Sequence, residues 1–123
     1  MRQIKASIDL GTNTARLLIG AKLNGNVERL HISRAITRLG GGFSKEKGIS
    51  RDAAQRTIAT LKEFAVTLNG FNVTELRAVA TSAVRDAVNR DEFCYEVKVA
   101  SGIELEVISG EEEGILTLLG VRS

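Results

Sequence analysis

"IDLGTNTARLLIG", residues 8–20, sets the fold at the start of the chain. An apolar segment ends at Asp9, and Gly11 is followed by a Thr-Asn-Thr run before apolar residues resume. The alternation of apolar and polar residues predicts strands at 3–9 and 14–23, with the polar run as the turn between them. Because this turn is short, the two strands are expected to be antiparallel neighbours.

The segments that follow predict more strands and helices. Asn24-Gly25 predicts a hairpin turn into a third strand at 27–36, because both residues tolerate a positive φ. Ser50 is expected to cap a helix with apolar residues every three or four positions, and Asn69-Gly70 to end it in a left-handed conformation. The later expected elements are a strand at 73–80, a short helix from "TSAVRDA", a helix capped by Asn89 and stopped by Gly102, a strand at 103–108 and a final helix after "SGEEEG".

This order, β-β-β-α-β-α-β-α, predicts an α/β fold with a mixed five-stranded sheet and helices on its faces. Helical crossovers return the chain in the same direction, so the first, fourth and fifth strands are expected to be parallel. The order is similar to that of the ribonuclease-H-like fold. With 123 residues, the chain is expected to form a single domain, residues 1–123.

Composition excludes several classes of function. A net charge of +2 with interspersed signs argues against a nucleic-acid or anionic-membrane partner. No apolar run has the length of a membrane helix, and no signal peptide is recognised, so a cytoplasmic location is expected. Cys94 and His31 are the single cysteine and histidine, which disfavours cysteine metal sites and Ser-His-Asp triads.

Polar turns follow three strands, at residues 9–14, 81–85 and 109–113. If the first, fourth and fifth strands are parallel neighbours, these turns meet at the carboxyl edge of the sheet. Ligands bind at that edge in open α/β sheets. The convergence therefore predicts a binding site there.

The first turn has the donors of a phosphate site and one carboxylate. Gly11 lets a ligand approach the main chain, and Thr12, Asn13 and Thr14 add hydroxyl and amide groups. Asp9 fits beside a phosphate only with a cation between them, and Mg²⁺ suits one carboxylate with phosphate oxygens and water. The alternative is a plain hairpin turn closed by an Asx hydrogen bond from Asp9.

The second turn offers an anion site of a different kind. Thr81 and Ser82 are expected to cap a helix whose first amides face the same edge. Arg85, one turn later, is placed to clamp a phosphate oxygen. The alternative for Arg85 is a surface ion pair with Asp86 or Asp91, which contributes little.

Two further segments each admit two interpretations. The glutamates of "SGEEEG", residues 109–114, suit the first turn of a helix without any function, and one of them near a phosphate would also serve as general base for water. "RLGGGF", residues 38–43, is either a mobile flap with Arg38 for anions or a plain connector, which the sequence favours.

Four stretches together resemble one family: "DLGTNTARLLI", "ITRLGGGF", "VATSAVRDAVNRDEF" and "VISGEEEGILTLLGV". They look like the exopolyphosphatase / guanosine pentaphosphate phosphohydrolase family, a branch of the actin, sugar-kinase and heat-shock-chaperone ATPase superfamily. The resemblance covers nearly the whole chain. It implies Mg²⁺-dependent release of terminal phosphate from polyphosphate or guanosine pentaphosphate, in a cleft between two ribonuclease-H-like domains. This chain looks like the first domain, which is expected to be inactive alone.

The resemblance also implies residue roles. Asp9 would bind Mg²⁺, directly or through water, residues 11–14 would hold phosphate, and Arg85 would contact the substrate. Glu113 aligns with the proposed general base, and Glu112 takes that place if the register shifts by one. The implied partners are polyphosphate or guanosine penta- or tetraphosphate, the missing second domain and, as one alternative for assembly, a second copy of the chain.

Two departures from the family pattern leave alternatives open. Gly114-Ile115-Leu116 stands where the family has Ala-Arg-Leu, and the family's second phosphate loop would follow after Ser123. The first departure favours a non-catalytic sensor of polyphosphate or nucleotide as the alternative function. A kinase of the same superfamily and an actin-like assembly protein share the first turn, but they leave "TSAVRDA" and "SGEEEG" unexplained.

Overall fold

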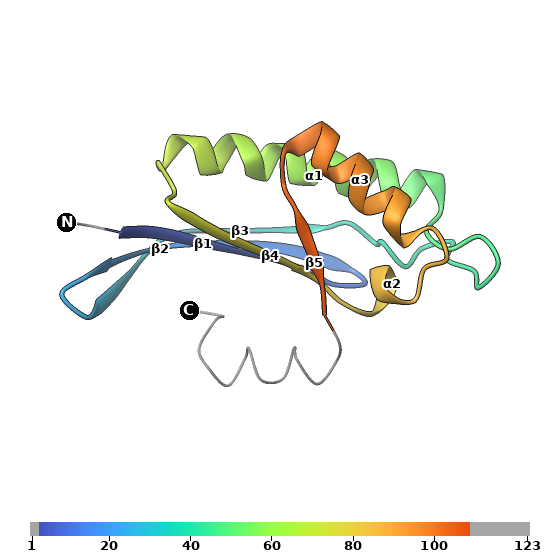
Figure 1. Ribbon diagram of the computed structural model, residues 1–123, viewed down its shortest axis with the longest axis horizontal. Helices are drawn as coiled ribbons and strands as arrows, with labels where there is room; N and C mark the ends of the chain where they lie inside the picture. The colour runs from blue at the N-terminus through green and yellow to red at the C-terminus, as the bar shows by residue number, and fades with distance from the viewer. Residues whose placement is uncertain (1–2, 109–123) are drawn as a thin grey trace.

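The computed structural model describes residues 3–108, which begin with an antiparallel meander (Figure 1). Its strands are β1 (Gln3–Leu10), β2 (Thr14–Leu23) and β3 (Asn26–Ile36). Asn24 and Gly25, between β2 and β3, have φ values of 53° and 82°. The predicted hairpin turn is therefore confirmed, because both residues occupy the left-handed region that such turns require.

The second half of the described chain alternates helices and strands. These elements are α1 (Arg51–Gly70), β4 (Glu75–Ala80), α2 (Ser82–Arg85), α3 (Arg90–Ser101) and β5 (Leu105–Val107). The strand order is β3-β2-β1-β4-β5, with β1 parallel to β4 and β4 parallel to β5. The predicted mixed five-stranded sheet and the parallel first, fourth and fifth strands are confirmed. The final predicted helix lies outside the described residues.

Helices α1 and α3 lie on the same face of the sheet (Figure 1), and the core fills the space between them and the strands. Alternate residues of β1 and β2 point into this core, including Ile8 and Leu17, which are fully buried. Leu61 of α1 and Val97 of α3 are fully buried on the helical side. The period of two therefore leaves Asp9 on the opposite face of the sheet from the helices.

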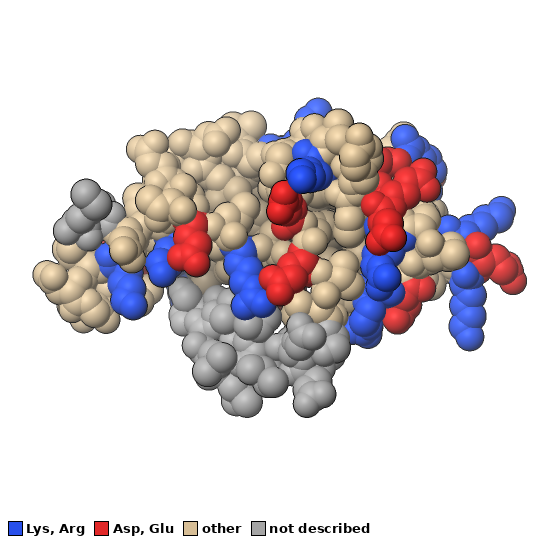
Figure 2. All heavy atoms as spheres, in the orientation of Figure 1, with Lys and Arg blue, Asp and Glu red and all other residues tan. Residues whose placement is uncertain are grey.

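Charged side chains are spread over the surface. Figure 2 shows acidic and basic groups interspersed on the visible face, as the mild net charge predicts. Within residues 3–108, no helix combines the length and apolar character needed to cross a membrane.

The two ends of α1 differ in how well the sequence predicted them. Ser50 Oγ accepts a hydrogen bond of 3.2 Å from the Ala53 amide, so the predicted cap is confirmed. The predicted left-handed end at Asn69-Gly70 is wrong: α1 continues through Gly70, and Asn72 is the left-handed residue, with φ 54°. The helix continues because Phe71 packs against the core and its ring centroid lies 5.5 Å from that of His31.

Asn89 precedes α3 as predicted, but its side chain makes no capping hydrogen bond. It binds both polar groups of Ile49 instead, accepting from the amide at 2.9 Å and donating to the carbonyl at 3.1 Å. Gly48, with φ 77°, passes so close that a Cβ there would lie 2.1 Å from Asn89 Oδ1. Asn89 therefore ties the segment before α1 to the start of α3.

Candidate functional site

The carboxyl ends of the three parallel strands meet at one edge of the sheet, where Leu10 pairs with Ala80 and Ala80 with Val107. The turn after β1 and the turn after β4 are consequently in contact. Thr12 Oγ1 and Ser82 Oγ share a hydrogen bond of 3.2 Å, and the Thr81 amide donates to the Leu10 carbonyl at 3.3 Å. The predicted convergence of these two turns is confirmed.

The third predicted turn follows directly on the described chain. The Ile108 amide donates to the Ala80 carbonyl at 3.0 Å, so β5 delivers the chain to the same edge. Residues 109–113 lie outside the described residues. The roles predicted for Glu113 and Glu112 therefore stay predictions.

The first turn is closed by its main chain. The Gly11 amide donates to the Thr14 carbonyl at 3.0 Å, and Thr12 and Asn13 are exposed at the tip. Within residues 3–108, the half-buried Asp9 carboxylate accepts no hydrogen bond and forms no ion pair. The Asx bond expected of a plain hairpin turn is thus missing, and Asp9 is left available for a cation.

Neither backbone strain nor packing explains the glycine at position 11. Its φ lies outside the left-handed region, and a Cβ there would contact only the Thr14 carbonyl oxygen, at an ordinary 3.5 Å. The backbone conformation at Gly11 therefore does not require glycine. The remaining explanation for a glycine at position 11 is the predicted close approach of a ligand to the main chain, and it stays a prediction.

The segment before α1 braces the first turn from behind. The Thr37 and Arg38 amides both donate to the Asn13 carbonyl, at 2.9 and 3.1 Å, and the Gly40 amide donates to the Thr12 carbonyl at 3.0 Å. Leu39, between them, is fully buried. These contacts favour the connector interpretation of "RLGGGF" over the mobile flap, because hydrogen bonds hold the main chain of the segment and the Leu39 side chain is buried in the core.

Arg56 on α1 completes this brace, and sequence reasoning missed it. Its Nε donates to the Thr37 carbonyl at 3.0 Å and its Nη2 to the Arg38 carbonyl at 3.1 Å. Arg56 stands on an exposed helical position like other arginines, so its spacing along α1 carries no signal. Only the fold brings it to the connector.

The second turn contains the predicted short helix. Thr81 is the N-cap of α2, as expected, but its side chain makes no capping bond and the helix has only four residues. The Val84 and Arg85 amides donate to the Thr81 carbonyl at 3.1 and 2.9 Å. The Ser82 and Ala83 amides make no hydrogen bond within this turn, as is usual for the first amides of a helix.

Arg85 is partly engaged within the protein. Its Nη1 donates to the Ile108 carbonyl at 3.2 Å, and its Nε lies 3.5 Å from Asp86 Oδ1. The alternative ion pair with Asp86 is therefore present, whereas Asp91 pairs with Arg90 at 3.7 Å. Asp86 is largely exposed, so that pair is worth little and does not prevent Arg85 from binding an anion.

The side chains at the strand ends suit a magnesium ion that is also bound by a phosphate, and they do not suit a metal ion held by protein ligands alone. Within residues 3–108, no group of three or more His, Cys, Asp or Glu side chains could hold a metal. Mg²⁺ usually takes one or two carboxylates and completes its shell with water and phosphate oxygens. Asp9, unpaired among the described residues, would supply the one carboxylate of such a site.

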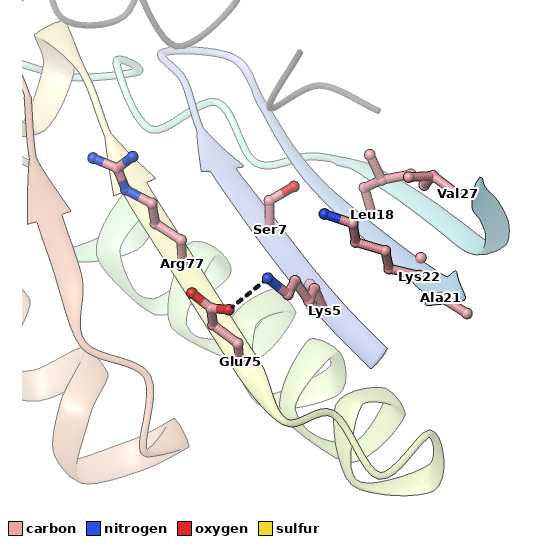
Figure 3. A pocket seen from close by; sticks show the side chains of 10 residues that line it. Lys5, Ser7, Leu18, Ala21, Lys22, Val27, Glu75 and Arg77 are labelled. Carbon is pink, nitrogen blue, oxygen red and sulfur yellow. Dashed lines mark ion pairs between the residues drawn. The ribbon is translucent and has the colours of Figure 1, made fainter. Parts of the chain in front are cut away.

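A separate hollow of about 290 Å³ lies on the sheet face opposite the helices (Figure 3). Lys5 and Glu75, which line it from the neighbouring strands β1 and β4, form an ion pair of 3.1 Å. Arg77, also in its lining, donates two hydrogen bonds of 3.0 Å to Glu106, and this lowers the pKa of the Glu106 carboxyl. Among the described residues that line the hollow, none belongs to either turn. We therefore place the candidate site at the strand ends, where the polar groups converge.

The sequence of the chain is similar to those of known phosphatases. Residues 18–123 match the family model described as the Ppx/GppA phosphatase family. The chain is 36% identical to exopolyphosphatase 1 of Mycobacterium tuberculosis over 116 residues, which cover 94% of this chain and 34% of that protein. The chain thus spans about a third of the length of the curated relative it matches.

Several solved structures share this fold, and two of them show how closely. The Ppx-GppA enzyme of Aquifex aeolicus superposes with a TM-score of 0.87 at 35% identity, over 92% of this chain and 38% of that chain. An exopolyphosphatase from Cytophaga hutchinsonii superposes with a TM-score of 0.88 at 36% identity, over 93% and 36% respectively. The predicted ribonuclease-H-like, actin-related architecture is confirmed by these structures.

Proposed function

The chain belongs to the Ppx/GppA phosphatase family, and from this premise we propose that it forms one wall of a cleft for phosphoanhydride hydrolysis. The substrate is inorganic polyphosphate or guanosine pentaphosphate, and the reaction releases a terminal phosphate. The observation that carries the proposal is the contact between the two polar turns, with Thr12 Oγ1 and Ser82 Oγ 3.2 Å apart. The names of the relatives, which are exopolyphosphatases, support the substrate class.

Each turn has its own task in this proposal. Thr12, Asn13 and Thr14 donate to phosphate oxygens, and Gly11 leaves room for them to approach. Ser82 and Arg85 bind from the second turn. Asp9 holds Mg²⁺, which when bound offsets the charge of the phosphate oxygens.

Hydrolysis proceeds by in-line attack of water on the terminal phosphorus. Glu113 accepts the proton of this water, or Glu112 does if the register is shifted by one. A bond forms between the water oxygen and phosphorus while the bridging P–O bond breaks, and the shortened chain leaves. Donors of the two turns stabilise the charge that spreads over the equatorial oxygens.

The relatives are about three times as long as the part matched here, so we propose that a second domain supplies the other wall of the cleft. The chain of residues 1–123 alone is then expected to turn over little substrate. We also propose that the protein is located in the cytoplasm and that two copies can form a homodimer. The sensor alternative is favoured by one observation, the replacement of the family's arginine by Ile115.

Phosphate release by the native-length protein tests this proposal. Long-chain polyphosphate and guanosine pentaphosphate are compared, each with and without Mg²⁺. Glu113→Gln is expected to lower kcat by about 100-fold or more, as loss of a general base does. Glu112→Gln tests the alternative register, and Glu111→Gln is the matched control in the same acidic run. If the unaltered protein and all the variants bind the substrate but release no phosphate, the protein is instead a sensor.

A further inference from the structure

We propose that Arg56 is a positioning residue that holds the phosphate turn in its binding conformation; this role rests on the proposed function. Arg56 lies on the second turn of α1 and reaches across to the connector. Its Nε donates to the Thr37 carbonyl at 3.0 Å and its Nη2 to the Arg38 carbonyl at 3.1 Å. Hydrogen bonds from a charged donor of this kind are stronger than neutral ones.

The contact is transmitted to the turn through one peptide unit. The carbonyl of Thr37 accepts from Arg56, and the amide of the same peptide, Arg38 N–H, donates to the Asn13 carbonyl at 3.1 Å. Hydrogen bonds in series polarise one another. The guanidinium charge therefore strengthens the bond that fixes Asn13, at the exposed tip of the turn.

The backbone of Arg38 depends on the same contact. Its φ of 51° lies in the left-handed region, which a residue with a side chain occupies at a cost. Its carbonyl accepts from both Arg56 Nη2 and the Gly41 amide, at 3.1 and 2.9 Å. Loss of Arg56 would release this conformation, and with it the two amides that hold Asn13.

The charge of Arg56 is directed at carbonyl groups. Within residues 3–108, Arg56 forms no ion pair with a carboxylate, and its positive charge lies behind the turn against the Thr37 and Arg38 carbonyl oxygens. Such a charge favours an anion in front of the turn. Arg51, on the same helix, donates instead to both carboxylate oxygens of Glu96 at 3.1 Å and serves as a matched control.

The experiment uses the native-length protein with Arg56→Met, Arg56→Lys and the control Arg51→Met. Hydrogen–deuterium exchange of peptides covering 36–41 reports the position of the connector. The kcat/KM for phosphate release from tripolyphosphate with Mg²⁺ reports the site. Arg56→Met is expected to speed exchange in these peptides and to lower kcat/KM by about ten-fold or more, mainly through KM. Arg56→Lys should fall between Arg56→Met and the unaltered protein, and Arg51→Met should change neither quantity.

Two results overturn the role of Arg56. The first is unchanged exchange in peptides 36–41 of the Arg56→Met protein, and the second is unchanged kcat/KM. If Arg56→Met does not fold, Arg56→Lys decides, because lysine keeps the charge but lacks the planar fork for two carbonyls. An unaltered protein that releases no phosphate contradicts the proposed function instead; exchange alone then decides whether Arg56 positions the connector.

Discussion

A methyl group at position 40 tests how closely the connector and the first turn are packed. In Gly40→Ala, the added Cβ would lie 2.6 Å from Thr12 Cγ2, well inside van der Waals contact. The φ of Gly40 lies outside the left-handed region, so the backbone itself accepts alanine. The effect of the substitution is therefore decided by one contact between side chains.

The expected magnitude is small and has a definite sign. Thr12 is exposed and can rotate to relieve the contact, but rotation breaks the bond between its Oγ1 and Ser82 Oγ. The lost bond costs about 0.5–1.5 kcal/mol, and a strained rotamer costs about the same. Alanine returns about 0.4–1 kcal/mol by restricting the unfolded chain. We expect Gly40→Ala to lower the free energy of unfolding by about 1 kcal/mol.

Thr12→Ser provides the decisive partner variant, since it removes Cγ2 and keeps the hydroxyl. In that background, Gly40→Ala is expected to stabilise by about 0.4–1 kcal/mol. The coupling in the double-mutant cycle is then about 1.5–2 kcal/mol, measured by urea unfolding. Gly70→Ala is the control, because a Cβ there has no heavy atom within 4 Å, and it should stabilise equally in both backgrounds. Equal effects of Gly40→Ala with and without Thr12 Cγ2 would refute the packing argument.

Three further expectations concern other parts of the molecule. Asn89→Ala removes both bonds to Ile49 and should lower the free energy of unfolding by about 1–3 kcal/mol in urea titrations, because it leaves the Ile49 groups unpaired; an unchanged midpoint would contradict this. The bonds from Arg77 lower the pKa of Glu106, so their stabilisation is present above the unfolded carboxyl's pKa of about 4.3 and disappears as pH falls through the lowered value. Both side chains are partly exposed, so Glu106→Gln should cost less than about 1 kcal/mol at pH 7 and nothing in acid; a cost that persists in acid would oppose this assignment. The chain of residues 1–123 should release little phosphate from polyphosphate, and a rate equal to that of the native-length protein would rule out the need for a second wall.

Local signals in the sequence were sufficient for much of the fold. Asn24-Gly25 and Ser50 act through their own backbone preferences, so their turn and cap could be predicted without any knowledge of the partner segments. The order of elements predicted the parallel strands, because helical crossovers return the chain in the same direction. The meeting of Thr12 and Ser82 followed from that order.

Contacts between distant segments could not be predicted in this way. Asn89 was expected to cap α3, but its side chain binds Ile49, 40 residues earlier, because the folded chain brings that backbone within reach. Helix α1 continues through Gly70, and the left-handed residue is Asn72, because Phe71 gains core contacts. Arg56 carried no local signal at all, since its partners belong to the connector.

Whether Asp9 holds Mg²⁺ for phosphate release is decided by the magnesium dependence of that release, compared between the native-length protein and its Asp9→Asn variant. Asparagine keeps the size of the side chain and removes the charge that would hold Mg²⁺. We expect release from polyphosphate that depends on Mg²⁺ in the unaltered protein and falls by about ten-fold to 100-fold in Asp9→Asn. Equal release by the two proteins, with the same dependence on Mg²⁺, would show that the turn at Asp9 does not hold the phosphate and its cation.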